Sequence, residues 1–481
     1  MNIEYHYLIL NIWIYIVIKD FLQVNSQKKG VKQMDVEQKT EQTVGIKKYD
    51  KLFEDYGVEP VPKEQTKNWL SMGLIWAGVG ISLGLLMTGG ALGNGLTFKQ
   101  SIIASFLGGI VLAIVTALCG IVGANTNLST AMISRFTFGE KAVLLIALIQ
   151  AFGSYGWFGV QLGLFGETSA AAWKIATGSD ANVTILIILG GICMILTSTI
   201  GYRGLDFLSK LAVPLLIILM GVSVYKVLQT YTVAEIMAFQ GTGDPISLGL
   251  GISMVISSFI VGAVVAPDIS RYAKTPKDTI GAAILAFVIV VPLVILVGSV
   301  MAQATGTWDL VDIMLRLGWG LTALLVLLLA QWTSNDNNLY CAALGFAVVF
   351  KTLKKWQLNV ISGLLGIILA VIGIYDNFIP WLNTLGVLIP PMGGVIAVDY
   401  YFFNKEYYKV EYLKKVDGLR KISLASWILG SLVSFITGNG IITLSTVPAL
   451  DGFIVAGIAQ YLLIKYTKQR LNSTFFESEQ I

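Results

Sequence analysis

Long apolar runs recur along the chain, and they constrain the fold more than any other feature. From Asn68 onward, hydropathy separates twelve runs, roughly 69–92, 98–122, 142–173, 182–201, 207–228, 246–267, 279–303, 319–349, 358–375, 378–403, 422–438 and 447–466. A helix needs about 20 apolar residues to cross a bilayer. Within lipid, only helices and closed barrels satisfy their own backbone hydrogen bonds. We therefore predict an all-α polytopic membrane protein with about twelve transmembrane helices.

The composition excludes several classes of function. Charged residues make up 13% of the chain, about half of the roughly 25% found in soluble proteins. The net charge of +4 is too small to indicate a nucleic-acid partner. The single histidine is His6, so the apolar body holds no histidine triad or histidine zinc site. The cysteines at 119, 193 and 341 fall in separate apolar runs. We expect no enzyme activity, no cofactor beyond a coupling ion and no obligate protein partner, with the lipid bilayer as surroundings.

The first 33 residues differ from the rest. Their apolar run, residues 8–18, is too short for a standard span. Residues 28–31, Lys-Lys-Gly-Val, are compatible with codons that contain a bacterial ribosome-binding sequence just upstream of Met34. We predict that translation starts at Met34 and that residues 1–33 are a mis-assigned extension. A genuine extra segment is the open alternative. Residues 34–68 then form a cytoplasmic tail.

Basic residues mark one side of the predicted membrane. Lys and Arg gather in every second loop, for example at Arg271, Lys274 and Lys277 and in the loop 405–421. Cytoplasmic loops carry this excess of positive charge. We predict a bacterial inner-membrane protein with both termini in the cytoplasm, the second being the tail 467–481.

Two runs contain residues that interrupt helices. The first has six glycines between positions 73 and 90, and the sixth combines Ser257, Ser258, Gly262 and Pro267. Interrupted helices in corresponding positions of two halves are typical of inverted-repeat transporters, which bind substrate near the midplane. We predict a five-helix repeat at 69–228, a second inverted one at 246–403, and two additional helices within 422–466.

The third run carries polar residues on one helix face: Gln150, Ser154, Trp157 and Gln161, at spacings of four, three and four. Amides at membrane depth need partners. A tryptophan offers a flat surface for stacking, and amides offer hydrogen bonds, so the face suits a planar heterocycle. A stripe that merely joins helices is the open alternative.

The eighth run is the most polar of all. One stripe contains Gln331, Ser334, Asn335 and Asn338, and Thr333 lies beside it. Such groups must face protein, water or ligand rather than lipid. The hydroxyls of Thr333 and Ser334 suit a small alkali cation, and carbonyls near Gly78 and Ser82 in the interrupted first run would complete the site. Back-bonding of these hydroxyls to their own helix is the alternative.

Charged residues are weaker candidates. Asp268 and Arg271 are expected to form an interfacial ion pair or gate, and Glu167 to reach water at the outer end of the third run. Asp336 is the one acid expected to be buried, and we favour a structural role for it as a hydrogen-bond acceptor.

Several motifs together resemble the nucleobase:cation symporter family. They are MTGGALGNGL at 87–96, GANTNLSTAMISRFTFG at 123–139, GWFGV at 156–160, SFI at 258–260 with APDISRY at 266–272, WTSNDNNLY at 332–340 and IPPMGGVIAVDYY at 389–401. The resemblance runs in order from about Trp69 to the last run. It implies a leucine-transporter-like core of two inverted five-helix repeats, two further helices, and alternating access.

The resemblance also implies roles for individual residues. Trp157 would stack on the substrate ring, and Ser258 with Phe259 would add a second ring and a backbone contact. A sodium site would lie between the first and eighth runs, formed by Gly78, Ser82, Ala330, Thr333 and Ser334.

Departures from the family pattern concern the substrate. The cytosine-transporting members have a glutamine at the position of Ser154, an asparagine at that of Ala330 and a serine at that of Val261. Gln161 is instead similar to the hydantoin-transporting member. Because bases are told apart by donor and acceptor placement, these departures argue against cytosine itself. A purine, another pyrimidine, a hydantoin and allantoin are equally admissible.

We therefore predict a secondary active transporter that imports a nucleobase or related planar heterocycle by symport with Na⁺ or H⁺. The expected substrate contacts are Trp157, Gln161, Ser154, Ser258, Phe259, Gln331, Asn335 and Asn338. The alternative is an amino-acid or other small-solute cation symporter of the same architecture.

Overall fold

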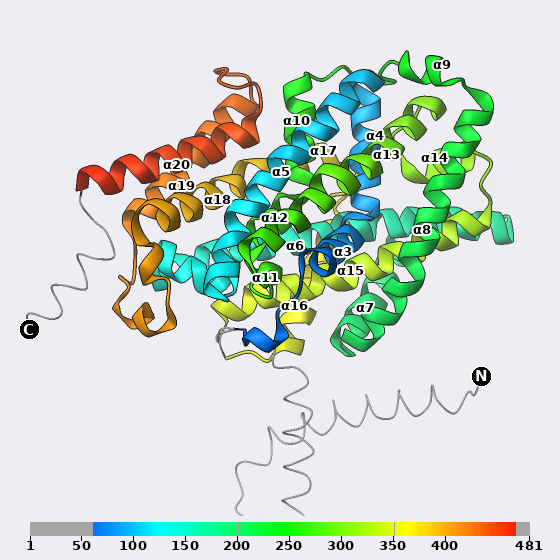
Figure 1. Ribbon diagram of the computed structural model, residues 1–481. Helices are drawn as coiled ribbons and strands as arrows, with labels where there is room; N and C mark the ends of the chain where they lie inside the picture. The colour runs from blue at the N-terminus through cyan, green and yellow to red at the C-terminus, as the bar shows by residue number, and fades with distance from the viewer. Residues whose placement is uncertain (1–60, 201, 351, 468–481) are drawn as a thin grey trace, which may run out of the picture. The chain divides into compact units, whose positions relative to one another are not determined.

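The computed structural model describes residues 61–200, 202–350 and 352–467. All of them belong to one compact unit, Val58–Ile481. The predictions for residues 1–33 and for nearly all of both tails lie outside the described residues. Within the described part, helices are the only extended regular structure, beside one isolated bridge between Lys67 and Ala273. The predicted all-α class is confirmed (Figure 1).

The described helices follow the apolar runs. The first half contains η1 (Lys63–Gln65), α3 (Trp69–Gly80), α4 (Leu83–Gly95), α5 (Phe98–Thr126), α6 (Thr130–Thr177), α7 (Val183–Ile200), α8 (Tyr202–Thr230) and α9 (Val233–Met237). The rest contains α10 (Leu248–Val264), α11 (Pro267–Ser270), α12 (Pro276–Ala283), η2 (Ile284–Val290), α13 (Val291–Thr305), α14 (Leu310–Arg316), α15 (Leu321–Val349), α16 (Lys355–Val371), α17 (Phe378–Leu388), α18 (Pro390–Val398), η3 (Asp399–Asn404), η4 (Lys405–Tyr407), η5 (Val410–Lys415), α19 (Lys421–Gly438) and α20 (Pro448–Thr467).

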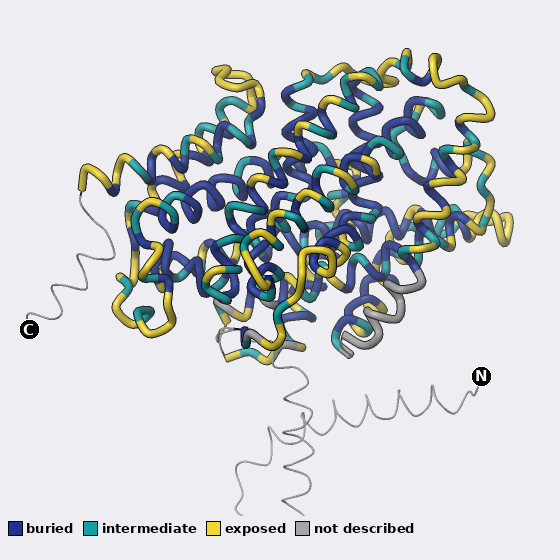
Figure 2. The backbone as a smooth tube through the Cα atoms, in the orientation of Figure 1, coloured by how far each residue is buried: buried dark blue, intermediate teal, exposed yellow. Residues whose placement is uncertain are grey.

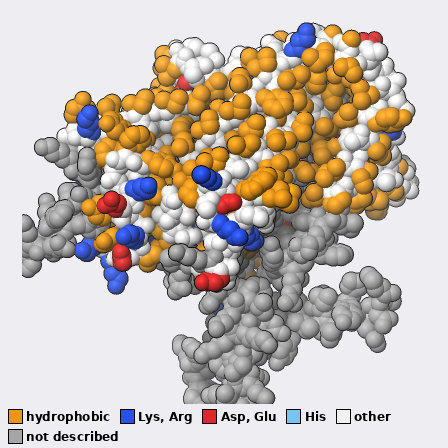
Figure 3. Space-filling model, in the orientation of Figure 1, with side chains coloured by type: hydrophobic (Ala, Val, Ile, Leu, Met, Phe, Trp, Pro, Cys, Tyr) orange, Lys and Arg blue, Asp and Glu red, His pale blue; other side chains and the backbone are white. Residues whose placement is uncertain are grey.

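The surface is that of a membrane protein. Among the described residues, seven helices are long and apolar enough to cross a bilayer, or eight if the bent pair α3–α4 counts as one span. Large apolar side chains such as Leu189, Ile218 and Ile368 are more than half exposed. Hydrophobic side chains cover much of the face drawn in Figure 3, and Figure 2 marks exposed residues along many of the helices. Soluble monomers rarely expose such a surface. The exact number of twelve spans stays a prediction.

The first apolar run is broken, as its glycines predicted. α3 and α4 meet at an angle of 59° across residues 81 and 82. α4 begins after Ser82, whose backbone is extended. A Cβ on Gly84 would lie 2.9 Å from Cζ3 of Trp157. A glycine is therefore required for this approach to α6.

The sixth run is not interrupted where its serines and glycine suggested. α10 continues through Ser257, Ser258 and Gly262 and ends at Val264. One further turn, α11, then begins at Pro267, a residue suited to the first position of a helix. The break lies at residues 265 and 266, directly before Pro267, while the helix stays regular at Ser257, Ser258 and Gly262, where neighbouring helices pack against the small residues.

α6 is divided at Gly139, whose φ of 84° and ψ of 164° are not helical. The part after Gly139 agrees with the predicted run 142–173 to within a few residues, and a further helical segment that begins at Thr130 precedes it. A Cβ on Gly139 would overlap the carbonyl oxygen of Asp417. A positive φ and this close approach both favour glycine.

Contacts between the two predicted repeats are reciprocal. α4 of the first run packs on α13, and α10 of the sixth packs on α5. The third and eighth runs pack together as α6 and α15, and the fourth and ninth as α7 and α16. Two related five-helix repeats would produce this exchange. The repeat bounds themselves stay a prediction.

A buried ion pair joins the last two helices to this core. Arg420 donates from both terminal nitrogens to Asp399 at 2.8 Å, and its Nη1 also reaches the carbonyl of Phe136 in α6. Gln460 of α20 and Tyr408 donate to the same carboxylate. Because both terminal nitrogens of Arg420 meet acceptors and both oxygens of Asp399 meet donors, the charges of the pair are compensated in the interior.

Candidate functional site

The ring of Trp157 lies at the break of the first helix. It is 9% exposed, and its six-membered ring faces Gly84 at the start of α4. On another side it meets Phe378 of α17, with centroids 5.8 Å apart and planes at 67°. The predicted stacking residue therefore lies where α4, α6 and α17 converge.

Gln161 follows one helical turn after Trp157. It is 4% exposed, and its Oε1 is buried without a hydrogen-bond partner. A buried acceptor left unpaired costs about 1–3 kcal/mol, so this oxygen is suited to a donor from a ligand. Ser154, earlier on the same face, donates to the carbonyl of Gln150 at 3.3 Å.

Ser258 and Phe259, the substrate contacts predicted in the sixth run, have different neighbours. The hydroxyl of Ser258 donates to Val255 within its own helix at 2.7 Å. Phe259 packs against Trp76 of α3 and Phe287 of η2, with centroids 6.0 and 5.1 Å away. Trp157 and Phe259 thus contact different rings, on the two sides of the α3–α4 break.

Two of the eighth-run amides, Gln331 and Asn335, are bound to α6, and the third, Asn338, is bound within α15. Gln331 Nε2 donates to Thr168 of α6 at 3.1 Å. Asn335 Nδ2 donates to the carbonyl of Phe158 at 3.2 Å, and Asn338 donates to Asn335 at 3.3 Å. This geometry favours a role in joining helices over one in reading substrate. Among the side-chain atoms of these three amides, Oε1 of Gln331 alone is buried without a hydrogen-bond partner.

Two acidic residues hold backbone or hydroxyl donors. Asp336 accepts from the hydroxyl of Thr197 in α7 at 3.0 Å, in agreement with the structural role expected for it. Asp268 accepts from the N–H of Thr130, at the start of α6. Arg271 Nε donates to the backbone carbonyl of Asp268 at 3.1 Å.

The predicted cation ligands lie in α3 (Gly78), just before α4 (Ser82) and in α15. α4 packs against α15, and Ser82, which precedes α4, makes no side-chain capping bond. A Cβ on Gly78 would meet no atom within 4 Å. On α15, the hydroxyl of Thr333 donates to the carbonyl oxygen of Ala330 at 3.0 Å, within its own helix, as the back-bonding alternative expects. Ca²⁺, a cation of similar size to Na⁺, holds oxygens at about 2.3–2.6 Å, so two oxygens this close can share one ion.

Ser334 is half-buried next to Thr333 on α15. The five residues predicted for the cation site therefore occupy the break of the first run and one stretch of α15. Among the described residues, no group of three or more His, Cys, Asp or Glu side chains is arranged to hold a metal ion. The predicted ligands themselves would offer neutral hydroxyl and carbonyl oxygens.

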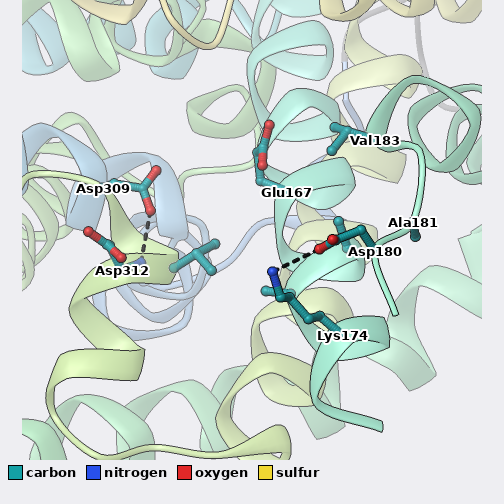
Figure 4. Close-up of a pocket in the computed structure, with 10 residues that line it drawn as sticks. Glu167, Lys174, Asp180, Ala181, Val183, Asp309 and Asp312 are labelled. Atoms are coloured by element: carbon teal, nitrogen blue, oxygen red, sulfur yellow. Dashed lines mark hydrogen bonds and ion pairs between the residues drawn. The ribbon is translucent and has the colours of Figure 1, made fainter. Parts of the chain in front are cut away.

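A separate cavity of about 380 Å³ opens at the C-terminal end of α6. Four carboxylates and one ammonium group line it, from Glu167, Lys174, Asp180, Asp309 and Asp312 (Figure 4). Lys174 pairs with Asp180 at 2.8 Å. Glu167 is exposed, as expected from its position. A cleft with excess negative charge raises the local concentration of cations.

Sequence reasoning missed two contacts of the tryptophan. Gly84 was one of many glycines in the first run, and Phe378 had no feature that separated it from other aromatic residues. Pro390 and Pro391 did carry a signal, because proline interrupts a helix. They divide the tenth run into α17 and α18.

These features define a class: a multi-pass membrane transporter with a broken helix beside a buried aromatic residue. The chain belongs to the family of permeases for cytosine/purines, uracil, thiamine and allantoin, which it matches over residues 60–458. It is a transporter and not an enzyme.

Curated relatives cover most of the chain. Cytosine permease of Escherichia coli K12 is 34% identical over 348 residues, which are 72% of this chain and 81% of the relative. Hydantoin permease of Microbacterium maritypicum is 21% identical over 420 residues, 80% of this chain and 85% of the relative.

Solved structures share the fold. Mhp1 in an inward-facing conformation superposes with a TM-score of 0.75 at 19% identity, covering 85% of this chain and 93% of Mhp1. Mhp1 in a closed conformation with bromovinylhydantoin bound, described as a nucleobase-cation-symport-1 family transporter, gives a TM-score of 0.72. At this identity the likeness concerns the fold alone.

Proposed function

We propose that the protein imports a planar nucleobase-like ring by symport with a cation. The observation that carries the proposal is the unpaired, buried Oε1 of Gln161, one turn from Trp157 at the break of the first helix. A flat aromatic surface beside an acceptor without a donor suits a ring that carries an N–H group.

In the proposed complex, the ring stacks on Trp157 and donates to Gln161. Ser154 and Ser258 supply further polar groups, and Phe259 closes the side formed by α3 and α10. Gln331 and Asn335 contribute mainly by holding α15 against α6, and Asn335 also donates to the sulfur of Met194 in α7. Asn338 supports Asn335 from within α15.

The substrate class rests on the relatives as well. One transports cytosine by its name and another hydantoin, and both molecules are small planar rings with N–H donors. We therefore infer a nucleobase, hydantoin or allantoin as substrate. The single ring of cytosine and the double ring of adenine are the first two compounds to compare.

Na⁺ is the cation that the donor set favours. The proposed ligands are neutral oxygens from Gly78, Ser82, Ala330, Thr333 and Ser334, and hard oxygens suit a small metal cation. Neither Asp336 nor Asp268 belongs to this set, because each already accepts a bond elsewhere. Coupling to H⁺ is the alternative that the experiment below separates.

For orientation, we propose a bacterial inner membrane with both termini in the cytoplasm. In Figure 3, most of the Lys and Arg side chains visible on the drawn face lie along its lower edge, where the loop that contains η4 and η5 is found in Figure 1. The acidic cavity at the end of α6 would then face outward and attract the cation. Alternating access would carry both solutes inward.

Uptake by the purified protein in liposomes tests the proposal. Labelled cytosine, adenine and hydantoin are offered with an inward Na⁺ gradient, with an inward H⁺ gradient, or with neither. We expect one ring to accumulate only with the Na⁺ gradient. Accumulation with the H⁺ gradient alone would contradict Na⁺ coupling. Uptake of none of the rings by folded protein would contradict the substrate class.

A further inference from the structure

The tenth run breaks at two consecutive prolines, and this break releases backbone carbonyls. In a continuous helix, the N–H of residue 390 would bond the carbonyl of Gly386, and that of residue 391 would bond Val387. Pro390 and Pro391 have no N–H. The N–H of Met392 bonds Ile389 at 3.1 Å, which leaves the carbonyl of Leu388 without its usual donor as well.

Two side chains of α19 replace the missing donors. The hydroxyl of Ser434 donates to the carbonyl of Gly386 at 3.2 Å. The indole N–H of Trp427 donates to the carbonyl of Leu388 at 2.9 Å. Both side chains are buried. Because each meets a carbonyl that the prolines leave without a helical donor, α19 repairs the break.

The N-terminal half of the tenth run, α17, covers the proposed substrate site. Phe378 meets Trp157 edge to face. Trp381 fills the space beside Gly156, where a Cβ would overlap its ring. Gly386 faces the hydroxyl of Ser257 in α10 closely enough that a Cβ there would overlap it.

The C-terminal half of the run is held by several buried hydrogen bonds. η3 begins at Asp399, which forms the buried ion pair with Arg420 and accepts from Tyr408 and Gln460. The proline break therefore lies between α18 with η3, which the ion pair holds in place, and α17, which covers the proposed substrate site.

We propose that α19 acts as a splint for this break: Trp427 and Ser434 are positioning residues that hold α17 against Trp157. This assigns a task in transport to a helix outside the predicted ten-helix core. This inference rests on the proposed function only in that α17 covers the proposed substrate site, and the test below needs no substrate. Failure of the splint and failure of the substrate proposal can therefore be told apart.

A cysteine reporter on α17 tests the splint. Leu382 is 0% exposed on this helix, and Leu382→Cys becomes reactive to a water-soluble maleimide only when α17 lifts. Trp427→Phe keeps an aromatic ring and removes the N–H. We expect it to raise the labelling rate of the reporter by roughly threefold or more, the effect of one lost hydrogen bond.

Two controls distinguish movement of α17 from a general destabilisation of the protein. Trp332→Phe removes another interhelical indole bond, to Thr197 of α7, and should leave the reporter unchanged. The native Cys119 of α5 is buried, and its labelling should stay constant in every variant. Background from the exposed Cys193 and Cys341 is measured without the reporter. Labelling of Cys119 that rises together with the reporter would overturn the proposal.

A double-mutant cycle separates hydrogen bonding from packing. Pro390→Ala restores an N–H that can bond Gly386 within the helix, so Ser434 becomes redundant. Ser434→Ala should raise labelling of the reporter with Pro390 present and have no effect in the Pro390→Ala chain. Equal effects in both backgrounds, or an unchanged rate in Trp427→Phe, would overturn the splint.

Discussion

The first and tenth runs are both broken helices, but the two breaks differ in whether side chains of another helix bond to the backbone there. At the first, α3 and α4 diverge by 59°, Ser82 makes no side-chain capping bond, and Gly78 faces open space. At the tenth, Ser434 and Trp427 of α19 donate to the carbonyls beside the prolines.

The comparison indicates that the role of a helix break depends on whether side chains of another helix pair its backbone groups. Every break leaves backbone groups that the helix itself cannot pair. Where side chains of another helix pair them, the break suits a hinge of defined position. Where they remain open beside a buried aromatic ring, the break suits ligands. We therefore assign binding to the first run and positioning to the tenth.

The largest effect is expected from Trp157→Ala, which removes the aromatic surface at the first break. Stacking of a base on an aromatic side chain contributes about 1–3 kcal/mol, and the variant also leaves a void beside Gly84. Uptake into liposomes should fall to the level of empty vesicles. Trp173→Ala, at the exposed end of α6, is the control and should transport normally. Normal uptake by a folded Trp157→Ala protein would remove the stacking model.

Thr333→Ala tests whether the open break shares a cation with α15. Loss of one oxygen ligand should raise the Na⁺ concentration for half-maximal uptake by about tenfold, equivalent to about 1.4 kcal/mol. Thr305→Ala is the matched control, since that hydroxyl back-bonds to Met301 in α13 at 2.8 Å. If the two variants show the same Na⁺ dependence, Thr333 only back-bonds to its own helix.

Gln161→Met tests the unpaired acceptor beside Trp157. The side chain keeps its length and loses the amide, so the ring should bind about three to ten times more weakly, the value of one hydrogen bond. Equilibrium binding at saturating Na⁺ measures this directly. Gln357→Met, at the cap of α16, should bind normally. An unaltered affinity in Gln161→Met would show that the acceptor does not face the substrate.

The smallest effect is expected from a pair of identical changes at the two breaks. Ser82→Ala should raise the half-saturating Na⁺ concentration about threefold, since it removes one weak oxygen ligand of several. Ser434→Ala should leave that concentration unchanged, because its hydroxyl is committed to Gly386. Titration of Na⁺-driven uptake compares the two. Equal shifts in both variants would abolish the distinction between the breaks.

Much of the fold could be predicted because lipid reduces the choices. Helix is the one regular structure available to each apolar run, and glycine content located the break of the first run correctly. The same signal misled at the sixth run, where small residues serve close packing: the Oγ of Ser257 lies where a Cβ on Gly386 would be. Small residues in membrane helices have both uses, and only the neighbouring helix separates them.

Hydropathy and helical periodicity are local properties, so the order of residues was enough to predict the membrane surroundings, the helical state and the face shared by Trp157 and Gln161. Which polar groups are already paired depends instead on how the helices pack. Gln331 meets Thr168 across 163 residues, and Ser434 meets Gly386 across 48. Such partners are set by how helices pack, and no local pattern reports them. That is why the eighth-run amides pointed to a ligand in the sequence and join helices in the fold.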